Sequence, residues 1–511
     1  MNNKIIKFTF AKQYQLNDVF KKKLMKRIFL VTLFAGFITF TFLLSSCKKD
    51  TQINDDPSVT LTLSTQSILF DTVFSTVGST TSMCYVKNPT SDKIVISSIR
   101  LANGNASQFS MNVDGVAAQS LSNVEIGPND SIFIFVKVTV DPQNSNSPMV
   151  VRDSILFELN GNVQDIDLTA WGQDAHYIVA DKTLGGSLHY KIVAGENENI
   201  TWTNDKPYLI YGYAVVDSTG KLNIEPGCRL HFYNNSGMWI YKYGTLKVNG
   251  TIDEPVTFQG SRLEASYKDL PGQWDRIWIN EGSNDNVINY AVIKNGFIGI
   301  QAETMSSAEN NRLILKNTVI KNMTGIGLLS RYYRILSGNC VFANCGGYAV
   351  ALTTGGNYDF RHCTLGNYYS FSSRQTPSLL ITNYYLAGPY TYTGDLDSAY
   401  FGNCIIYGSN SEELETDSVA DAAFNYKFEY CLLKSTNYSS DSRLTNCIFN
   451  QEVMFKDYGN NDYSLSPGSA AIDAANINLI YFPVIDLIYD IKGHNRTLNP
   501  PPDLGAYDYI P

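Results

Sequence analysis

The five residues AVIKN at positions 291–295 are the first clear copy of a phrase that decides the fold of this chain. Further copies read TVIKN at 318–322, CVFAN at 340–344 and CTLGN at 363–367, and shorter ones read CII at 404–406, CLL at 431–433 and CIF at 447–449. Their first residues lie 27, 22, 23, 41, 27 and 16 positions apart. A short apolar strand that returns with a period in the low twenties is typical of a solenoid, in which each copy belongs to one turn.

The geometry of such a coil explains the letters that recur. The apolar residues come in short runs between Asn, Gly and Ser, and no helical stripe with a period of 3.6 residues is present. Equivalent positions on successive turns lie about 4.8 Å apart, so a small first residue stacks on its counterpart inside the coil. The Asn that ends the phrase tolerates a left-handed bend, and its amide can bond the amides above and below. We therefore predict an amide ladder through Asn295, Asn322, Asn344 and Asn367.

Segments on either side of these copies resemble the right-handed parallel β-helix of secreted, pectate-lyase-like proteins. GTLKVNG at 244–250 is similar to their opening turns. SLSPGSAAID at 464–473 and DLGAYDY at 503–509 are similar to a paired ending that is common among them. The resemblance implies a right-handed parallel β-helix over residues 177–511, with a C-terminal closing segment.

The start of the chain predicts a secretory signal peptide over residues 1–46. Residues 21–27 are basic, and residues 28–44 are apolar and uncharged. The alternative is a signal anchor that stays in the membrane as a helix. Met25 is itself followed by Lys and Arg, so it is a possible true start of the protein.

The LSSC that follows at 44–47 resembles the lipobox of bacterial lipoproteins. The resemblance implies that Cys47 becomes the lipid-bearing N-terminus and that residues 47–57 form a tether. Lys48 stands where an Asp would favour retention at the inner membrane, so the resemblance implies an outer-membrane lipoprotein. Whether it faces the periplasm or the cell surface stays open.

Residues 58–176 alternate apolar and polar residues in short runs, as in IFIFVKV at 132–138. Turn formers such as NP at 88–89 and GPND at 127–130 separate about seven such runs, a spacing typical of a β-sandwich. Their order resembles the immunoglobulin-like modules beside repeat domains in bacterial surface proteins, which implies a spacer or docking module. The predicted fold class is therefore all-β, an immunoglobulin-like β-sandwich followed by a right-handed parallel β-helix.

Composition limits the partners of the protein. The 511 residues carry a formal net charge of -9, and no basic stripe is available to bind phosphates, which argues against nucleic acid as a partner. Five cysteines share the first position of the phrase: Cys340, Cys363, Cys404, Cys431 and Cys447. Their stacked Cα atoms would fall inside the disulfide range, but other copies hold Ala or Thr there, which favours small buried thiols. No Cys-x-x-Cys pair or nearby His completes a metal site, and no metal is expected.

Acid–base catalysis is one candidate function, because some β-helix proteins cleave polysaccharides. The repeated strands carry almost no acids, and the Asn-Thr-Asp, Asp-Asp and Gly-His-Gly series of pectin hydrolases is absent from the sequence. The best catalytic candidates are His362, Arg361 and Asp359, and the alternative is a histidine that merely occupies the turn. Charged residues near the chain end are interpreted as pairs that tie the tail to the coil: Asp473, Asp490, Arg496 and Asp503.

Ligand binding is the other candidate function. The 41-residue step between Cys363 and Cys404 holds one turn plus an insertion, and insertions often mark the binding edge of a solenoid. Candidate ligand-binding residues in this step are Tyr368, Tyr369, Tyr384, Tyr385, Tyr390 and Tyr392, with Tyr332 and Tyr333 one or two turns earlier. The alternative is that these rings pack over the coil's own surface. Asp395 and Asp397 are a candidate calcium site, and no other cofactor is expected.

Two functions therefore stay open. The first is a lipid-anchored cell-envelope protein whose β-helix binds a glycan or a surface partner, or acts as a scaffold, without catalysis. The second is a polysaccharide lyase or glycoside hydrolase that acts on an extracellular polysaccharide. A cluster of carboxylate, Arg, Lys or His side chains on one coil face would discriminate between them, and the linear sequence shows none.

Overall fold

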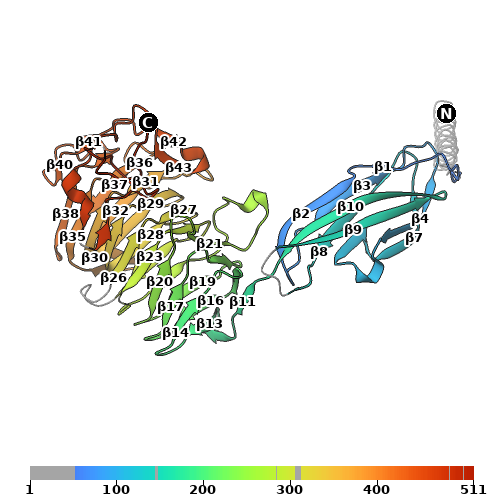
Figure 1. The fold of residues 1–511 in the computed structure, drawn as a ribbon, viewed down its shortest axis with the longest axis horizontal. Coiled ribbons are helices and arrows are strands. Elements are labelled where there is room, and N and C mark those ends of the chain that lie inside the picture. Colours follow the sequence, from blue (N-terminus) through green and yellow to red (C-terminus); the bar gives the residue numbers. More distant parts are fainter. Residues whose placement is uncertain (1–51, 144–147, 284, 305–311, 483, 499) are drawn as a thin grey trace, which may run out of the picture.

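The computed structural model describes residues 52–143, 148–283, 285–304, 312–482, 484–498 and 500–511. The fold is all-β, as predicted, with a pair of sheets followed by a long parallel coil (Figure 1). The described residues form short 3-10 turns and no α-helix. A helix long and apolar enough to cross a membrane is accordingly not found among them.

The first body consists of two five-stranded sheets around one core. One sheet has the order β1 (Thr62–Leu63), β3 (Ser82–Lys87), β8 (Ser131–Val138), β5 (Phe109–Val113) and β6 (Val116–Ala117). The other has the order β2 (Ser67–Phe74), β10 (Asn162–Gln173), β9 (Met149–Leu159), β4 (Ile94–Leu101) and β7 (Ser120–Ile126). Inward side chains of both sheets, among them Phe109 and Phe157, form one buried cluster. The immunoglobulin-like assignment and the domain boundaries stay predictions.

The second body is a coil whose strands stack into three parallel faces, which we name A, B and C. Face A contains β13 (Leu188–Ala194), β16 (Tyr213–Val216), β19 (Gly237–Ile240), β22 (Ile277–Ile279), β25 (Ile300–Glu303), the first halves of β28 (Leu328–Gly338) and β30 (Val350–Arg361), β32 (Leu379–Thr382) and β37 (Leu414–Asp417). Face B contains β14 (Asn199–Trp202), β17 (Lys221–Ile224), β20 (Thr245–Asn249), β23 (Asn286–Asn289), β26 (Arg312–Lys316), the second halves of β28 and β30, β35 (Leu396–Gly402), β38 (Phe424–Glu429) and β40 (Leu444–Thr445). Ahead of them, β12 (Lys182–Leu184) pairs antiparallel with β13.

Face C is an eleven-stranded parallel sheet, and the recurring phrase forms its later strands. It contains β11 (His176–Val179), β15 (Tyr208–Tyr211), β18 (Arg229–Phe232), β21 (Val256–Gly260), β24 (Ala291–Lys294), β27 (Val319–Met323), β29 (Val341–Cys345), β31 (Thr364–Asn367), β36 (Ile405–Gly408), β39 (Leu432–Leu433) and β41 (Ile448–Phe449). The three faces enclose one buried apolar cluster, in which the ring of Phe401 lies 5.0 Å from that of Phe360 and 4.8 Å from that of Phe428. The cysteines of the phrase line this interior as free thiols.

The corner between faces C and A bends as predicted but is bonded differently. Asn295, Asn322 and Asn344 have the expected positive φ, between 49° and 68°. The predicted ladder through them and Asn367 is wrong, because other segments cover this corner and take up the amides. Asn295 donates to two backbone carbonyls, for example, and Asn344 donates to Asn461 Oδ1 at 2.9 Å.

An amide ladder lies instead at the corner between faces B and C. Asn317 Nδ2 donates to Asn289 Oδ1 at 3.0 Å, and Asn339 Nδ2 donates to Asn317 Oδ1 at 3.1 Å. The residue just before the phrase has a φ between 45° and 54° in seven turns: Tyr290, Asn317, Asn339, His362, Asn403, Tyr430 and Asn446. The turn geometry therefore selects Asn most often at this corner too.

Face C is covered on its outer side by segments from distant parts of the chain. At its first strands, Phe74 of the sandwich packs edge-on against His231, with ring centroids 5.0 Å apart. The loop 261–273 follows and is held there by Lys294, whose Nζ donates to a backbone carbonyl of the loop at 3.0 Å. The corner between faces A and B lies on a different side of the coil from these contacts.

The C-terminal segment, residues 450–511, covers the rest of face C. It contains β42 (Phe455–Asp457), β43 (Asp462–Leu465), β44 (Tyr481–Phe482) and β45 (Ile485–Asp486). The ring of Tyr463 lies where Gly366 has no side chain, since an added Cβ would come within 2.5 Å of it. The segment thus packs back along the flank of the coil, over strands far from the last turn.

Candidate ligand-binding cleft

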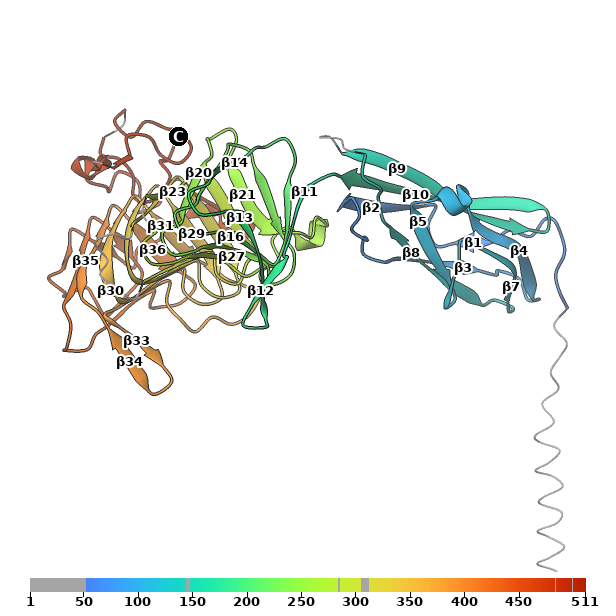
Figure 2. The same ribbon diagram turned by 90° about the horizontal axis from the view of Figure 1, so that it is seen from below.

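A cleft of about 550 Å³ runs along the corner between faces A and B. A hairpin of β33 (Tyr384–Ala387) and β34 (Tyr390–Thr393) projects from the coil between β32 and β35 (Figure 2). Its residues form the overhang of the cleft. The floor comes from residues at the end of face A on five successive turns, among them Tyr241, Glu281, Glu303, Arg331, Tyr332 and Thr354. Four strand spacings correspond to about 19 Å, enough for a short stretch of a chain-like ligand.

Glu303 is the most highly bonded group of the floor. Its carboxylate accepts hydrogen bonds from Trp278 Nε1 at 2.7 Å, Gln301 Nε2 at 2.8 Å and Arg331 Nη1 at 2.9 Å. Trp278 in turn stacks on Trp239 of the preceding turn, with ring centroids 5.0 Å apart. Because all these groups stand on face A strands, the carboxylate is held in one position.

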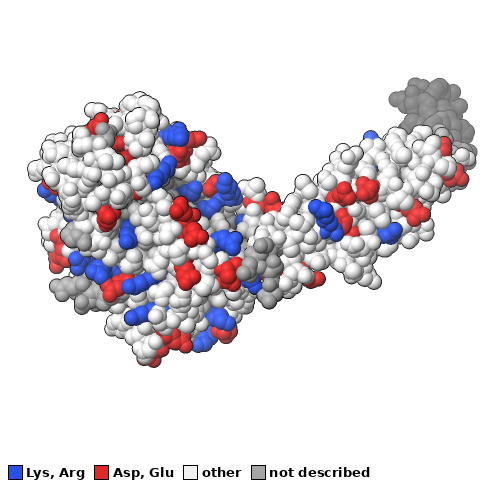
Figure 3. Space-filling view, in the orientation of Figure 1, with Lys and Arg blue, Asp and Glu red and all other residues white. Residues whose placement is uncertain are grey.

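Both cations of the cleft are paired with anions. Arg331 bonds Glu303, and Lys242 Nζ lies 2.7 Å from Glu281 Oε1. The bond to Glu281 raises the pKa of Lys242 above its usual value, so this ammonium stays charged. With two cations and two anions in its lining, the cleft has no net charge. Basic and acidic side chains are also interspersed over the face of the coil seen in Figure 3, without a stripe of one sign.

Two floor residues stand in a strained backbone. Tyr332 and Thr354 have φ values of 53° and 62°, where the pairing of β28 with β30 shifts register. A left-handed Thr is unusual because its side chain branches at Cβ, and such strain costs about 1–3 kcal/mol per residue. Bulges of this kind redirect side chains next to functional sites. Burial, then the charges of Asp395 and Asp397, raise the pKa of Tyr332, so its hydroxyl stays protonated.

Two tyrosines fix the hairpin over the floor. The guanidinium carbon of Arg331 lies 4.1 Å from the centre of the Tyr385 ring, a cation–π contact. On the adjacent position, Tyr384 Oη donates to Asp417 Oδ2 at 2.5 Å, which raises the pKa of Tyr384. Tyr385 pairs with Tyr392 across the hairpin, so both rings project from the same side and line the cleft.

The structure separates the six tyrosines predicted to bind ligand. Tyr385 and Tyr392 line the cleft, Tyr384 anchors the hairpin base, and Tyr390 is 67% exposed beside the hairpin turn. Tyr332, which the sequence placed one or two turns earlier, completes the aromatic lining with Tyr241.

Tyr368 and Tyr369 lie in another part of the coil. The ring of Tyr368 stacks on Tyr458 of the C-terminal segment, with centroids 4.1 Å apart, and burial raises its pKa. Tyr369 contacts Phe371, with ring centroids 5.6 Å apart. For these residues the structure favours the alternative of rings packed over the coil's own surface.

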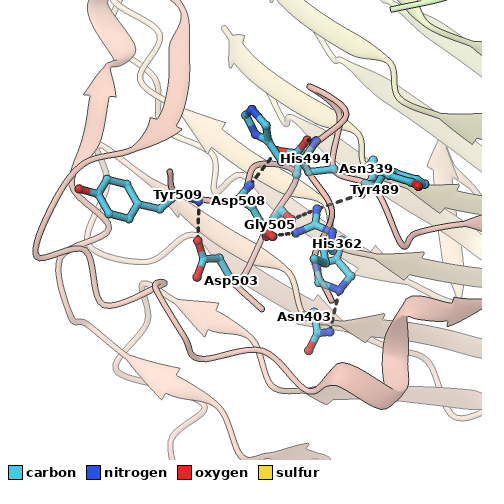
Figure 4. A network of polar contacts seen from close by, with 12 residues as sticks. Asn339, His362, Asn403, Tyr489, His494, Asp503, Gly505, Asp508 and Tyr509 are labelled. Carbon is cyan, nitrogen blue, oxygen red and sulfur yellow. Dashed lines mark hydrogen bonds and ion pairs between the residues drawn. The ribbon is translucent and has the colours of Figure 1, made fainter. Parts of the chain in front are cut away.

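The three catalytic candidates do not meet in a cavity. Asp359 and Arg361 form an ion pair of 3.0 Å on face B. His362 is fully buried at the next corner, where Asn403 Nδ2 donates to its Nε2 at 2.9 Å (Figure 4). Burial and the charge of Arg496 hold the pKa of His362 well below its usual value, so the ring stays neutral. None of the three belongs to the described lining of the cleft.

Of the four charged residues predicted to tie the tail to the coil, Arg496 does so, whereas Asp490 and Asp503 accept hydrogen bonds from the tail itself (Figure 4). Arg496 is fully buried, pairs with Asp508, and donates to Asn339 Oδ1 at 3.1 Å. Asp503 accepts a hydrogen bond from the backbone N–H of Asp473 at 2.7 Å. The bond of Arg496 to Asn339 holds the C-terminal segment on the flank of the coil, and the bond of Asp503 stabilises the segment internally.

Two predictions concern residues whose role is not tested. Cys47 lies outside the described residues, so lipidation, the signal peptide and the outer-membrane location stay predictions. Asp395 Oδ1 accepts from Ala423 N–H at 2.8 Å and so links its loop to the loop before β38 on the next turn. Within the described residues, no group of three or more His, Cys, Asp or Glu side chains is arranged to hold a metal ion. The calcium hypothesis for Asp395 and Asp397 stays a prediction.

The charged residues of the cleft floor were missed from the sequence. Lys242, Glu281, Glu303 and Arg331 all come directly at or after the end of a face A strand. Glu303 and Arg331 even occupy paired positions on neighbouring turns. Aligning the turns on face A rather than on the phrase of face C would have brought these residues into one column.

Comparisons with known proteins agree with this architecture. A family model described as a right handed beta helix region matches residues 192–365, and no curated protein matches. The chain is similar to a solved ASH / PapD-like domain of human CEP192 (PapD-like domain 7), with 8% identity over 26% of this chain and 97% of that chain and a TM-score of 0.18. It is similar to a family 123 glycoside hydrolase from Clostridium perfringens, with 8% identity over 23% of this chain and 28% of that chain and a TM-score of 0.17.

Neither likeness to a solved structure is strong enough to support an argument about function. The family match covers most of the cleft floor, from Tyr241 to Thr354. Together with the parallel pairing of the three faces, it confirms the β-helix part of the predicted fold, and the coil of this chain is a right-handed parallel β-helix.

Proposed function

We propose that the cleft binds a short, uncharged stretch of a polysaccharide without cleaving it, in a protein held at the cell envelope by a lipid on Cys47. The observation that carries this proposal is the lining of the cleft, in which tyrosine rings face charged groups that already neutralise one another.

Aromatic rings suit the apolar C–H faces of sugars, and a few fixed polar groups suit their hydroxyls. Tyr385 and Tyr392 supply rings from the overhang, and Tyr332 and Tyr241 supply rings from the floor. The volume of about 550 Å³ lies within the usual range of small-ligand sites.

The charge pairs argue for an uncharged ligand. A uronate would need a free cation, but Arg331 is bonded to Glu303 and Lys242 to Glu281. Pulling either cation toward an anionic sugar would leave a carboxylate beside that sugar, and like charges at an interface are costly.

Catalysis is the second candidate, because Glu281 and Glu303 are two carboxylates in one cleft. A pair of carboxylates is the usual equipment of a glycosidase. Each is bonded to a cation, however, and Glu303 accepts two further hydrogen bonds, which suits positioning of a ligand better than proton transfer.

The test uses the chain from Thr51 onward, which contains every described residue. It is incubated with neutral and uronate-containing polysaccharides, and both binding and new chain ends are measured. We expect binding of a neutral polysaccharide that falls at least about tenfold in Tyr392→Ala, a loss of about 1.4 kcal/mol. Leu386→Ala, on the opposite face of the same hairpin, is the matched control and should bind normally.

Two results would decide against the proposal. New chain ends that disappear in Glu303→Gln or Glu281→Gln would make the protein an enzyme. Binding that is unchanged by Tyr392→Ala, Tyr385→Ala and Tyr332→Ala would move the ligand site away from the cleft.

A further inference from the structure

The outer face of one sandwich sheet is apolar where such a face is normally polar. Met83 and Tyr85 on β3 and Phe133 and Phe135 on β8 all point outward, with exposed fractions of 57%, 42%, 43% and 39%. They form two directly opposed cross-strand pairs, Met83 with Phe135 and Tyr85 with Phe133. Antiparallel sheets usually turn polar side chains to water, so these four residues form an exposed apolar face.

The outward strand positions beside this apolar face carry charges of one sign, whereas the exposed carboxylates of Asp114 and Asp130 stand in the turns that adjoin it. Among the outward positions of β3, β5 and β8, Lys87 and Lys137 are exposed cations, and the strands place no carboxylate there. The opposite sheet differs, because Glu158, Asp165 and Asp167 stand exposed on its outer face. In a chain with a net charge of -9, the apolar face is thus a local exception.

We propose that this apolar face lies against the lipid bilayer, with its aromatic rings at the level of anionic headgroups. The inference rests on the proposed lipid anchor. Tyr and other amphipathic rings favour the membrane interface, and Lys side chains are attracted to an anionic lipid surface.

The position of the proposed lipid anchor argues that the apolar face contacts a lipid surface. Gln52, the first described residue, follows Cys47 by five residues, which span at most about 18 Å. Ile53 is bridged to Lys93, which leads into β4 of the opposite sheet, and β1, which follows, pairs with β3 of the sheet that carries the apolar face. The apolar face is therefore held close to the bilayer, and even a weak contact is formed at high effective concentration.

The consequence for the proposed function is geometric. A sandwich that lies flat on the bilayer fixes one side of the protein to the membrane. The β-helix then extends from the sandwich end at which Phe74 contacts His231 of the coil.

The experiment places a tryptophan in the apolar face of the chain from Thr51 onward. Phe133→Trp is compared with Leu69→Trp, a matched control at an exposed position (66%) on the opposite sheet. Each variant is tethered by an N-terminal histidine tag to phosphatidylcholine–phosphatidylglycerol vesicles that contain a nickel-chelating lipid. Lipids with brominated acyl chains quench tryptophans that enter the bilayer.

We expect bromolipid quenching and a blue shift for Phe133→Trp, and little change for Leu69→Trp. Exchanging phosphatidylglycerol for phosphatidylcholine, or adding Lys87→Glu and Lys137→Glu, should weaken the quenching. Equal quenching of the two variants, or none in either, would overturn the proposal. So would a stable dimer in sedimentation that Phe135→Ser converts to monomer, because a second copy would then cover this face.

Failure of this inference can be told apart from failure of the proposed function. The artificial tether tests the apolar face whether or not Cys47 carries a lipid, and lipidation is read separately from the mass of the mature N-terminus. Polysaccharide binding by Phe133→Trp should remain normal, because the substitution lies outside the cleft.

Discussion

The guanidinium carbon of Arg331 lies 4.1 Å from the centre of the Tyr385 ring, and this contact joins the coil to the hairpin above it. The same guanidinium bonds Glu303 at 2.9 Å. One side chain therefore orders both the floor and the overhang of the cleft.

Removing this contact should loosen the hairpin. A cation–π pair contributes about 0.5–2 kcal/mol, so Arg331→Ala and Tyr385→Ala should each speed proteolysis within residues 386–391. The double variant should lose less protection from proteolysis than the two single variants lose in sum, because the two residues act together. Phe371→Ala, which removes an exposed ring outside the hairpin, is the control and should leave cleavage of the hairpin at the rate of the unaltered protein. Fully additive effects would show that the two side chains act independently.

Replacing His362 should show a role in the turn rather than in catalysis. The residue is left-handed, with a φ of 48°, and bonds Asn403. Asn tolerates this conformation, so His362→Asn should keep its urea midpoint, whereas the β-branched His362→Val should lose about 1–2 kcal/mol. If His362 were catalytic, both variants would instead be inactive in an activity assay, whatever their stability.

Native thiol labelling should reach a single cysteine of the eight described. Cys447 is partly exposed, and its hydrogen bond with Cys431 lowers its pKa. The other seven are buried, and burial raises the pKa of thiols such as Cys404 well above the usual value. Since the thiolate is the reactive form, iodoacetamide should add one group before unfolding and eight after it. Mass spectrometry of the chain from Thr51 onward measures both, and rapid native labelling of Cys363 would contradict the expectation.

The C-terminal segment should loosen as the pH rises. Burial raises the pKa of Asp508 to about 6, against the opposing charge of Arg496. This pKa lies above the ordinary value of 3.8, so the folded state binds more protons between these values. The contribution of Asp508 is therefore greatest below about pH 4 and declines as the pH passes about 6, by at most about 3 kcal/mol. Hydrogen exchange over residues 488–508 measures this effect. From about pH 4 to about pH 7, the protection of Asp508→Asn should increase relative to that of the unaltered protein. A constant difference over that range would exclude the titration of this carboxyl.

The regular part of the fold could be predicted because one phrase recurs in seven of the eleven strands of face C. The left-handed Asn residues followed from the same repeat. The bonding of their amides could not, because it depends on which distant segment covers the corner. Asn344, for example, bonds Asn461.

The cleft could be predicted only in part. Tyr385 and Tyr392 stand in a recognisable insertion, so their type and position pointed to a ligand. Glu303 and Arg331 stand in turns of unequal length, and their pairing becomes visible only when face A is in register. His362 looked catalytic by residue type, whereas burial decides its state.

The C-terminal segment that covers face C also determines the order in which parts of the chain can fold. Arg496 bonds Asn339 across 157 residues of sequence. Contacts at such separation form late, because the intervening chain must first be ordered. A chain that emerges N-terminus first can wind its early turns, but their outer apolar strands stay bare until the last residues arrive. A ribosome that stalls near the end of the message would thus leave a folded coil whose exposed apolar strands can associate with other chains.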